Sequence, residues 1–146
     1  VKKVDQAGRV ALSKGVAFTY HNHAQELARI PAAGGKTALD YMRDHTDPKA
    51  VLFELDTFWI KKGGEEPLAT IRNFKGRANQ IHLKDMDPAD QTFTEVGNGL
   101  MDLPGIFKAA MEAGSEWVIV EQDTCKRPAL DSARISITNL KKAGLA

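Results

Sequence analysis

The chain contains a single cysteine, Cys125, so it has no second thiol with which to form an intrachain disulfide. One free thiol is typical of proteins from a reducing compartment, and we expect a cytoplasmic protein. The same scarcity argues against an iron–sulfur cluster or a structural zinc site, because these sites use several thiolate ligands.

Long apolar runs and an excess of either charge are also missing. No apolar run approaches the roughly 18–20 residues that a membrane-spanning helix needs. Lysine and arginine together number 20, aspartate and glutamate number 19, and the formal net charge is +1. Because this balance provides no general attraction for polyanions, we expect neither nucleic acid nor a membrane as the main partner.

The composition that is present is that of an ordinary globular domain. Of the 146 residues, 42% are hydrophobic and 27% are charged, which argues against disorder. No low-complexity tract or linker divides the sequence. We therefore expect one domain over residues 1–146, large enough to bury a substantial core.

Four short apolar segments are predicted to be β-strands, and helical segments separate them. Apolar runs of this length, bounded by turn residues, are typical of strands that are buried in a parallel sheet. The alternation of strands and helices therefore predicts an α/β fold with a parallel sheet. The predicted strands are Val16–His23, Val51–Asp56, Ala78–His82 and Trp117–Glu121.

The intervening segments carry helical spacing and recognisable start or stop residues. An amphipathic helix is predicted over residues 2–14, ending at Gly15. Later helices are expected to begin near Thr37, Pro67, Leu103 and Asp131. The order is thus one helix followed by four strand–helix units.

Each of the four predicted strands ends in a group that can bind a divalent metal: His21 and His23 in the first strand, then Asp56, His82 and Glu121. In a barrel of parallel strands the carboxyl ends converge on one rim, where the active site is built. Oxygen and imidazole ligands suit Mg²⁺, Mn²⁺, Co²⁺ or Zn²⁺. The sequence therefore predicts a divalent-metal site at that rim.

The first strand region is expected to supply a fourth ligand. Glu26 is the preferred residue, and His21 and His23 are the alternatives. The two histidines are two positions apart, so they share a face if the segment is a strand. A purely structural hydrogen-bonding role for the pair is the competing interpretation.

Each single residue also has a structural interpretation. A carboxylate such as Asp56 at a strand end can cap a helix, and one histidine after an apolar run is more often structural than ligating. Lys84 follows His82 by two positions and is predicted to assist proton transfer or hold a substrate oxygen, with a solvated lysine as the alternative. Trp59 could form a wall for a sugar ring or pack in the core, and Asp123 could orient Glu121.

These strings resemble the C-terminal half of the sugar phosphate isomerase/epimerase family, the xylose isomerase-like TIM barrels. The resemblance covers nearly the whole chain, in the expected order and spacing. The segments that carry it are Tyr20–Leu27, Glu54–Trp59 with Gly63–Gly64, Gly76–Arg77, His82–Asp85, Glu95–Gly99 and Val120–Asp123.

The resemblance implies a (β/α)₈-type fold and a metal-dependent reaction on a sugar or sugar phosphate. Members of this superfamily bind one divalent cation and interconvert aldoses and ketoses, or epimerise beside a carbonyl, by proton or hydride transfer. Related barrels act as lyases. Carried onto this chain, the metal ligands are Glu26, Asp56, His82 and Glu121; the catalytic groups are Glu26, Glu121, Lys84 and His23; and the substrate contacts are His21, His23, Trp59 and Lys84.

Only the last four strand–helix units of such a barrel are expected here, which would leave two open sheet edges and half an interior uncovered. A second copy, a different chain or a further part of a longer protein could cover them. We expect a homodimer, because a two-fold axis would bury both edges with one self-complementary surface.

Two other functions remain as alternatives to an isomerase or epimerase. One is a catalytically silent half-barrel that serves as an assembly or binding module. The other is a DNA-repair nuclease, because apurinic endonucleases share this barrel. Those enzymes use several zinc ions and additional histidines, and Trp59 stands where one of these histidines is expected, so the nuclease is the weakest of the three.

Overall fold

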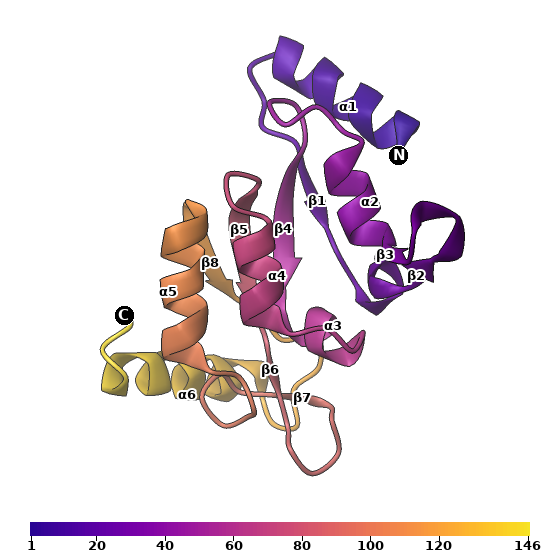
Figure 1. Cartoon of the computed structure of the whole chain (residues 1–146). Coiled ribbons are helices and arrows are strands. Elements are labelled where there is room, and N and C mark those ends of the chain that lie inside the picture. Colours follow the sequence, from indigo (N-terminus) through magenta and orange to yellow (C-terminus); the bar gives the residue numbers. More distant parts are fainter.

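The computed structural model describes residues 1–146 and contains a parallel sheet with the strand order β1-β4-β5-β8 (Figure 1). All three neighbouring pairs in this sheet are parallel. The prediction of an α/β, TIM-barrel-like half-barrel is confirmed, with the sheet open and not closed into a barrel. The strands are β1 (Thr19–His21), β4 (Leu52–Asp56), β5 (Ala78–Leu83) and β8 (Trp117–Val120).

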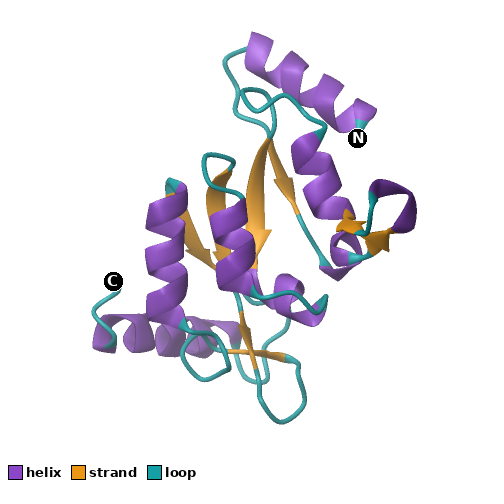
Figure 2. Cartoon of the chain, in the orientation of Figure 1, coloured by secondary structure: helices purple, strands orange, loops and turns teal.

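Six α-helices accompany the sheet, and α4 and α5 lie side by side over one of its faces (Figures 1 and 2). The first helix, α1, lies beyond the end of the sheet at which the strands begin (Figure 1). The bounds are α1 (Lys2–Ser13), α2 (Ala38–Asp44), α3 (Thr57–Lys62), α4 (Pro67–Asn73), α5 (Leu103–Ala113) and α6 (Ala129–Lys142).

Three of the four expected helix starts have the local chemistry that the sequence indicates, whereas α6 begins at Ala129, so Asp131 lies within its first turn and does not cap it. Thr37 caps α2, because its hydroxyl oxygen accepts the amide of Asp40 at 3.0 Å. Pro67 is the first residue of α4, where its missing N–H costs nothing. Gly114 follows α5 with φ +83°, a left-handed conformation that favours glycine at a helix end.

Several short elements were not predicted. The most important is α3, a helix of six residues that begins directly after β4. The first strand is shorter than the predicted Val16–His23, since only Thr19–His21 pairs with β4. The remaining elements are the 3₁₀ helices η1 (Ala24–Leu27) and η2 (Pro31–Ala33), and the short pairs β2 (Arg29–Ile30) with β3 (Lys36–Thr37) and β6 (Asp85–Met86) with β7 (Phe93–Thr94).

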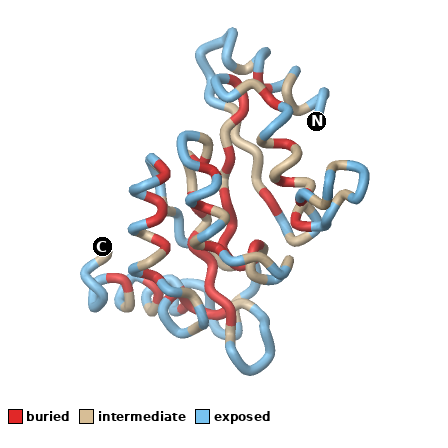
Figure 3. Tube along the Cα trace, in the orientation of Figure 1, coloured by how far each residue is buried: buried red, intermediate tan, exposed pale blue.

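The hydrophobic core lies between the helices and one face of the sheet, as the buried segments of Figure 3 show. Phe53, Leu55, Ile81 and Leu83 point to this side and are fully buried. Side chains alternate along a strand, so the residues between them occupy the opposite face. That opposite face, called the open face below, carries the polar residues at the strand ends and no covering layer of helices.

The long polar segment after β5 is held together by one buried carboxylate. Asp85 accepts the backbone amides of Met86, Gly97, Gly99 and Met101 at 2.8–3.0 Å. This segment is therefore an ordered loop beside the strand ends. None of the helices combines the length and the apolar character required to cross a bilayer.

Candidate metal centre

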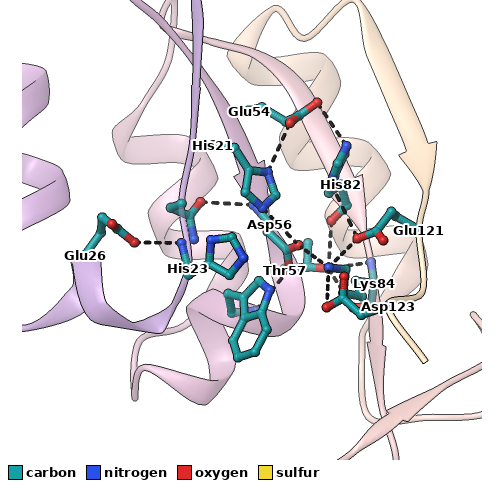
Figure 4. Close-up of polar contacts among 12 residues, drawn as sticks. His21, His23, Glu26, Glu54, Asp56, Thr57, His82, Lys84, Glu121 and Asp123 are labelled. Carbon is teal, nitrogen blue, oxygen red and sulfur yellow. Dashed lines mark hydrogen bonds and ion pairs between the residues drawn. The ribbon is translucent and has the colours of Figure 1, made fainter. Parts of the chain in front are cut away.

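Parallel pairing brings the predicted strand-end residues together on the open face (Figure 4). Asp56 of β4 is the register partner of His82 of β5. At the next pair of strands Leu83 is opposite Val120, and the amide of Glu121 donates to Leu83 at 3.3 Å. Asp56, His82 and Glu121 therefore meet at one edge of the sheet, as the sequence predicts.

Three of these side chains form a group that could hold a metal ion. His21, Asp56 and His82 each offer one ligand atom, and the three atoms lie within 4.8 Å of one another. His21 comes from the end of β1, so three neighbouring strands contribute one residue each. Two imidazoles and one carboxylate are a donor set that divalent cations accept.

His82 Nδ1 is buried without a hydrogen-bond partner, and the buried Asp56 Oδ2 has only its ion pair with Lys84 Nζ at 3.0 Å. Unpartnered buried polar atoms are costly and need an explanation. The other oxygen of Asp56 is occupied, because Oδ1 accepts the amide of Trp59 at 3.0 Å and caps α3. The helix-cap interpretation of Asp56 is thus correct for one oxygen, and the second oxygen lies between Lys84 Nζ at 3.0 Å and His21 Nε2 at 3.8 Å. These atoms fit a cation ligand role.

Lys84 lies at the centre of the acidic residues of the site. Its side chain is 1% exposed, and its Nζ lies 3.0 Å from Asp56 Oδ2 and 3.0 Å from Asp123 Oδ2. A third ion pair joins it to Glu121. The alternative of a solvated lysine is wrong, since the ammonium is enclosed by three carboxylates.

The charges of this cluster shift its pKa values in a defined way. Burial opposes the charge on Lys84, but hydrogen bonding to Glu121 and the charge of Asp56 outweigh burial and raise the pKa of the ammonium. Burial also raises the pKa of Asp56, and the Trp59 amide and the Lys84 ammonium offset only part of that effect. Lys84 is therefore a stable cation at neutral pH.

Glu54 belongs to the site but was not identified from the sequence. Its carboxylate lies 3.0 Å from His21 Nδ1 and 3.0 Å from His82 Nε2. The sequence does contain an indication of this position. Glu54 is a charged residue within an apolar strand and lies two positions before Asp56, on the same face. Asn22 was also missed; it is fully buried, and its Oδ1 accepts the Asp56 amide at 3.0 Å.

Glu26, His23 and Trp59 were also predicted as site residues, and they lie around this centre without belonging to the group of His21, Asp56 and His82. Glu26 is turned away from it, with its oxygens engaged by the His23 amide at 2.7 Å and the Tyr20 hydroxyl at 3.1 Å (Figure 4). The His23 ring stacks obliquely on Trp59, with 5.1 Å between ring centroids. Trp59 also contacts Phe93, so it belongs to an aromatic wall beside the centre. The roles predicted for these three residues stay predictions.

Known sequences identify the family of this chain. Residues 1–143 match the family model described as the xylose isomerase-like TIM barrel. An inosose dehydratase of Clostridium beijerinckii is 28% identical over 140 residues, covering 82% of this chain and 45% of that protein. An inosose dehydratase of Klebsiella pneumoniae is 30% identical over 136 residues, covering 80% of this chain and 44% of that protein.

Solved structures agree with this result. A sugar phosphate isomerase/epimerase from Parabacteroides distasonis superposes with a TM-score of 0.79 at 29% identity, covering 99% of this chain and 51% of that one. A D-tagatose 3-epimerase-like protein, at 14% identity and a TM-score of 0.66, shares the fold. The chain thus spans about half the length of the relatives that it matches.

Replacing Lys84 tests the charge balance of the site. We expect Lys84→Met to lower the free energy of unfolding by about 3–5 kcal/mol at neutral pH, because it leaves three crowded carboxylates without their cation. The loss should shrink at acidic pH, where the carboxylates take up protons. Urea unfolding at both pH values measures it, with Lys61→Met as the control, since Lys61 makes only an exposed pair with Glu66. Equal stability of the two variants at neutral pH would contradict this account.

Proposed function

The chain belongs to the xylose isomerase-like TIM barrel family, and on that premise we propose that it is a divalent-metal-dependent isomerase or epimerase. The substrate would be a sugar, a sugar phosphate or a similar polyol with a carbonyl group. The observation that carries this proposal is the group of His21, Asp56 and His82, in which His82 Nδ1 is buried without a hydrogen-bond partner beside the buried Asp56 carboxylate. Such a group at the carboxyl ends of parallel strands is where barrels of this kind place their chemistry.

The proposed ligands are His21, Asp56 and His82, with Glu121 as the fourth. Glu121 Oε2 lies 3.8 Å from His82 Nδ1, beside the group. His21 is preferred here over Glu26, because both oxygens of Glu26 already accept hydrogen bonds. The mixture of imidazole and carboxylate suits Mn²⁺, Co²⁺ or Zn²⁺ better than Mg²⁺.

A cation bound by these residues would polarise the carbonyl and hydroxyl oxygens of the substrate and stabilise an enediolate. The chain itself must then move a proton at the carbon next to the carbonyl. Glu121 is the proposed base, because its side chain is 32% exposed and reaches the open face. Glu26, which the sequence also predicts for this role, would first have to leave its hydrogen bonds with the Tyr20 hydroxyl and the His23 amide. His23 is proposed to assist.

Lys84 is proposed to act as a donor to a substrate oxygen and not as the base. Its raised pKa keeps it protonated at neutral pH, so it has a proton to donate and no lone pair to offer. His21, His23 and Trp59 are proposed to contact the substrate, with Trp59 as an apolar wall for the sugar ring. Its ring contacts with His23 and Phe93 give that wall a fixed orientation.

A dehydratase is the second candidate, and the names of the inosose dehydratase relatives favour it. Dehydration beside a carbonyl begins with the same proton removal as epimerisation. The two reactions differ in the next step, because an epimerase returns a proton to the carbon whereas a dehydratase releases the neighbouring hydroxyl as water. Lys84 could supply the proton for that water.

Deuterium exchange tests the shared first step. With Mn²⁺ in D₂O, we expect the protein to introduce deuterium beside the carbonyl of at least one substrate from a panel of ketoses, aldoses and keto-inositols, followed by NMR. Treatment with EDTA should stop the exchange and Mn²⁺ should restore it. His82→Ala should reduce the rate at least about 100-fold, since it removes a proposed ligand.

The control for this experiment is His45→Ala, because His45 is an exposed residue that contacts Tyr41 and lies outside the site. It should exchange like the unchanged protein. Exchange that resists EDTA would contradict metal dependence. Tight Mn²⁺ binding without exchange on any substrate would favour the alternative of a catalytically silent binding module.

We further propose that two copies of the chain pair into a barrel-like dimer. The open face carries exposed apolar side chains on the edge strand β8, with Trp117 62% exposed and Ile119 37% exposed. Both β1 and β8 have one unpaired edge, which is a liability for a chain on its own. A second copy would cover the apolar side chains and pair the edges.

Light scattering after size exclusion tests the dimer. We expect a particle of twice the 16.0 kDa chain mass. Ile119→Asp should shift the particle toward the monomer, because it places a charge in the proposed interface. Met111→Asp is the control, since Met111 is 79% exposed on α5, away from the open face. A compact monomer of the unchanged chain would contradict the proposal.

A further inference from the structure

Glu54 lies in the middle of β4, between the rings of His21 and His82 (Figure 4). One carboxylate oxygen is 3.0 Å from His21 Nδ1, and the other is 3.0 Å from His82 Nε2. The side chain is 17% exposed, and no lysine or arginine pairs with it. The polar contacts of the Glu54 carboxylate are therefore with the two imidazole rings.

This geometry determines which ring nitrogens carry hydrogen. An ionised carboxylate only accepts hydrogen bonds, so the nitrogens facing Glu54 must donate. A neutral imidazole carries one N–H, and its second nitrogen then has a free lone pair. His21 Nε2 and His82 Nδ1 are the nitrogens left free, and both belong to the side that faces the carboxylates of Asp56 and Glu121.

We propose that Glu54 is a positioning residue that fixes the tautomers of His21 and His82, so that both lone pairs are presented to one cation. One carboxylate thereby orders two ligands from different strands, β1 and β5. The inference rests on the proposed function, because the lone pairs matter only if a cation is held by these residues. Carboxylates that hold ligating histidines in this way are worth about 10–100-fold in metal affinity.

Glu54→Gln separates this role from a merely structural one. Glutamine has the same size and still forms hydrogen bonds, so packing and the strand are retained. Its amide, however, has one acceptor oxygen and one donor nitrogen. The glutamine oxygen can accept from one imidazole and keep that ring in the required tautomer. The glutamine NH₂ must donate to the other imidazole, whose N–H then moves to the nitrogen that faces the cation. Glu54→Asp keeps the ionised acceptor and serves as the conservative variant.

The first readout is the tautomer of each ring in the metal-free protein, measured by long-range proton–nitrogen NMR. The chain has only four histidines, so single substitutions assign the signals. We expect hydrogen on Nδ1 of His21 and on Nε2 of His82. Glu54→Gln should change at least one of these, and Glu54→Asp should change neither. Finding either ring of the unchanged protein in the opposite tautomer would overturn the proposal.

The second readout is Co²⁺ affinity by calorimetry, together with the visible spectrum of bound Co²⁺. Glu54→Gln should weaken binding by about 10–100-fold and alter the spectrum, and Glu54→Asp should keep most of the affinity. The control Glu112→Gln should behave like the unchanged chain, because Glu112 pairs only with Arg72 on the surface. Equal affinity of Glu54→Gln and the unchanged protein would overturn the proposal. Failure of the unchanged protein to bind Co²⁺ would instead refute the proposed function, and the NMR comparison would still decide the role of Glu54.

Discussion

Parallel hydrogen bonding across β4 and β5 decides which side chains of this chain meet. It pairs Asp56 with His82, and the adjoining β1 and β8 bring His21 and Glu121 to the same edge. Since side chains alternate along each strand, all these groups emerge on the open face. A shift of one residue in any strand would turn its polar residues into the hydrophobic core, so the buried apolar residues also enforce the geometry of the site.

The second constraint is electrostatic. Asp56 and Lys84 are almost completely buried, and Glu121 and Asp123 lie against the same ammonium. Burying these charges separately would be prohibitive, but together they compensate one another. The network leaves His82 Nδ1 buried without a hydrogen bond, which a purely structural network would avoid. This unpaired nitrogen supports the proposed ligand role of His82.

Much of this architecture is predictable from the sequence because it depends on local patterns. Apolar runs mark β4, β5 and β8, and Thr37, Pro67 and Gly114 mark helix ends. The short helix α3 was missed because six residues carry too little periodicity. The position of Glu26 was also beyond sequence reasoning. It depends on the turn after His21, where η1 folds the Glu26 carboxylate back onto the His23 amide. Glu54 was not predicted, because it lies in the middle of β4 and not at the end of the strand, where Asp56 lies.

The central claim is that separate strands deliver their imidazoles and carboxylates to one cation. A crystal structure of the protein grown with Mn²⁺, with anomalous diffraction recorded at the manganese absorption edge, tests it most directly. The account predicts one strong anomalous peak within about 2.0–2.3 Å of His21 Nε2, Asp56 Oδ2 and His82 Nδ1. Crystals that bind manganese elsewhere, or that show no peak among these three atoms, would contradict it.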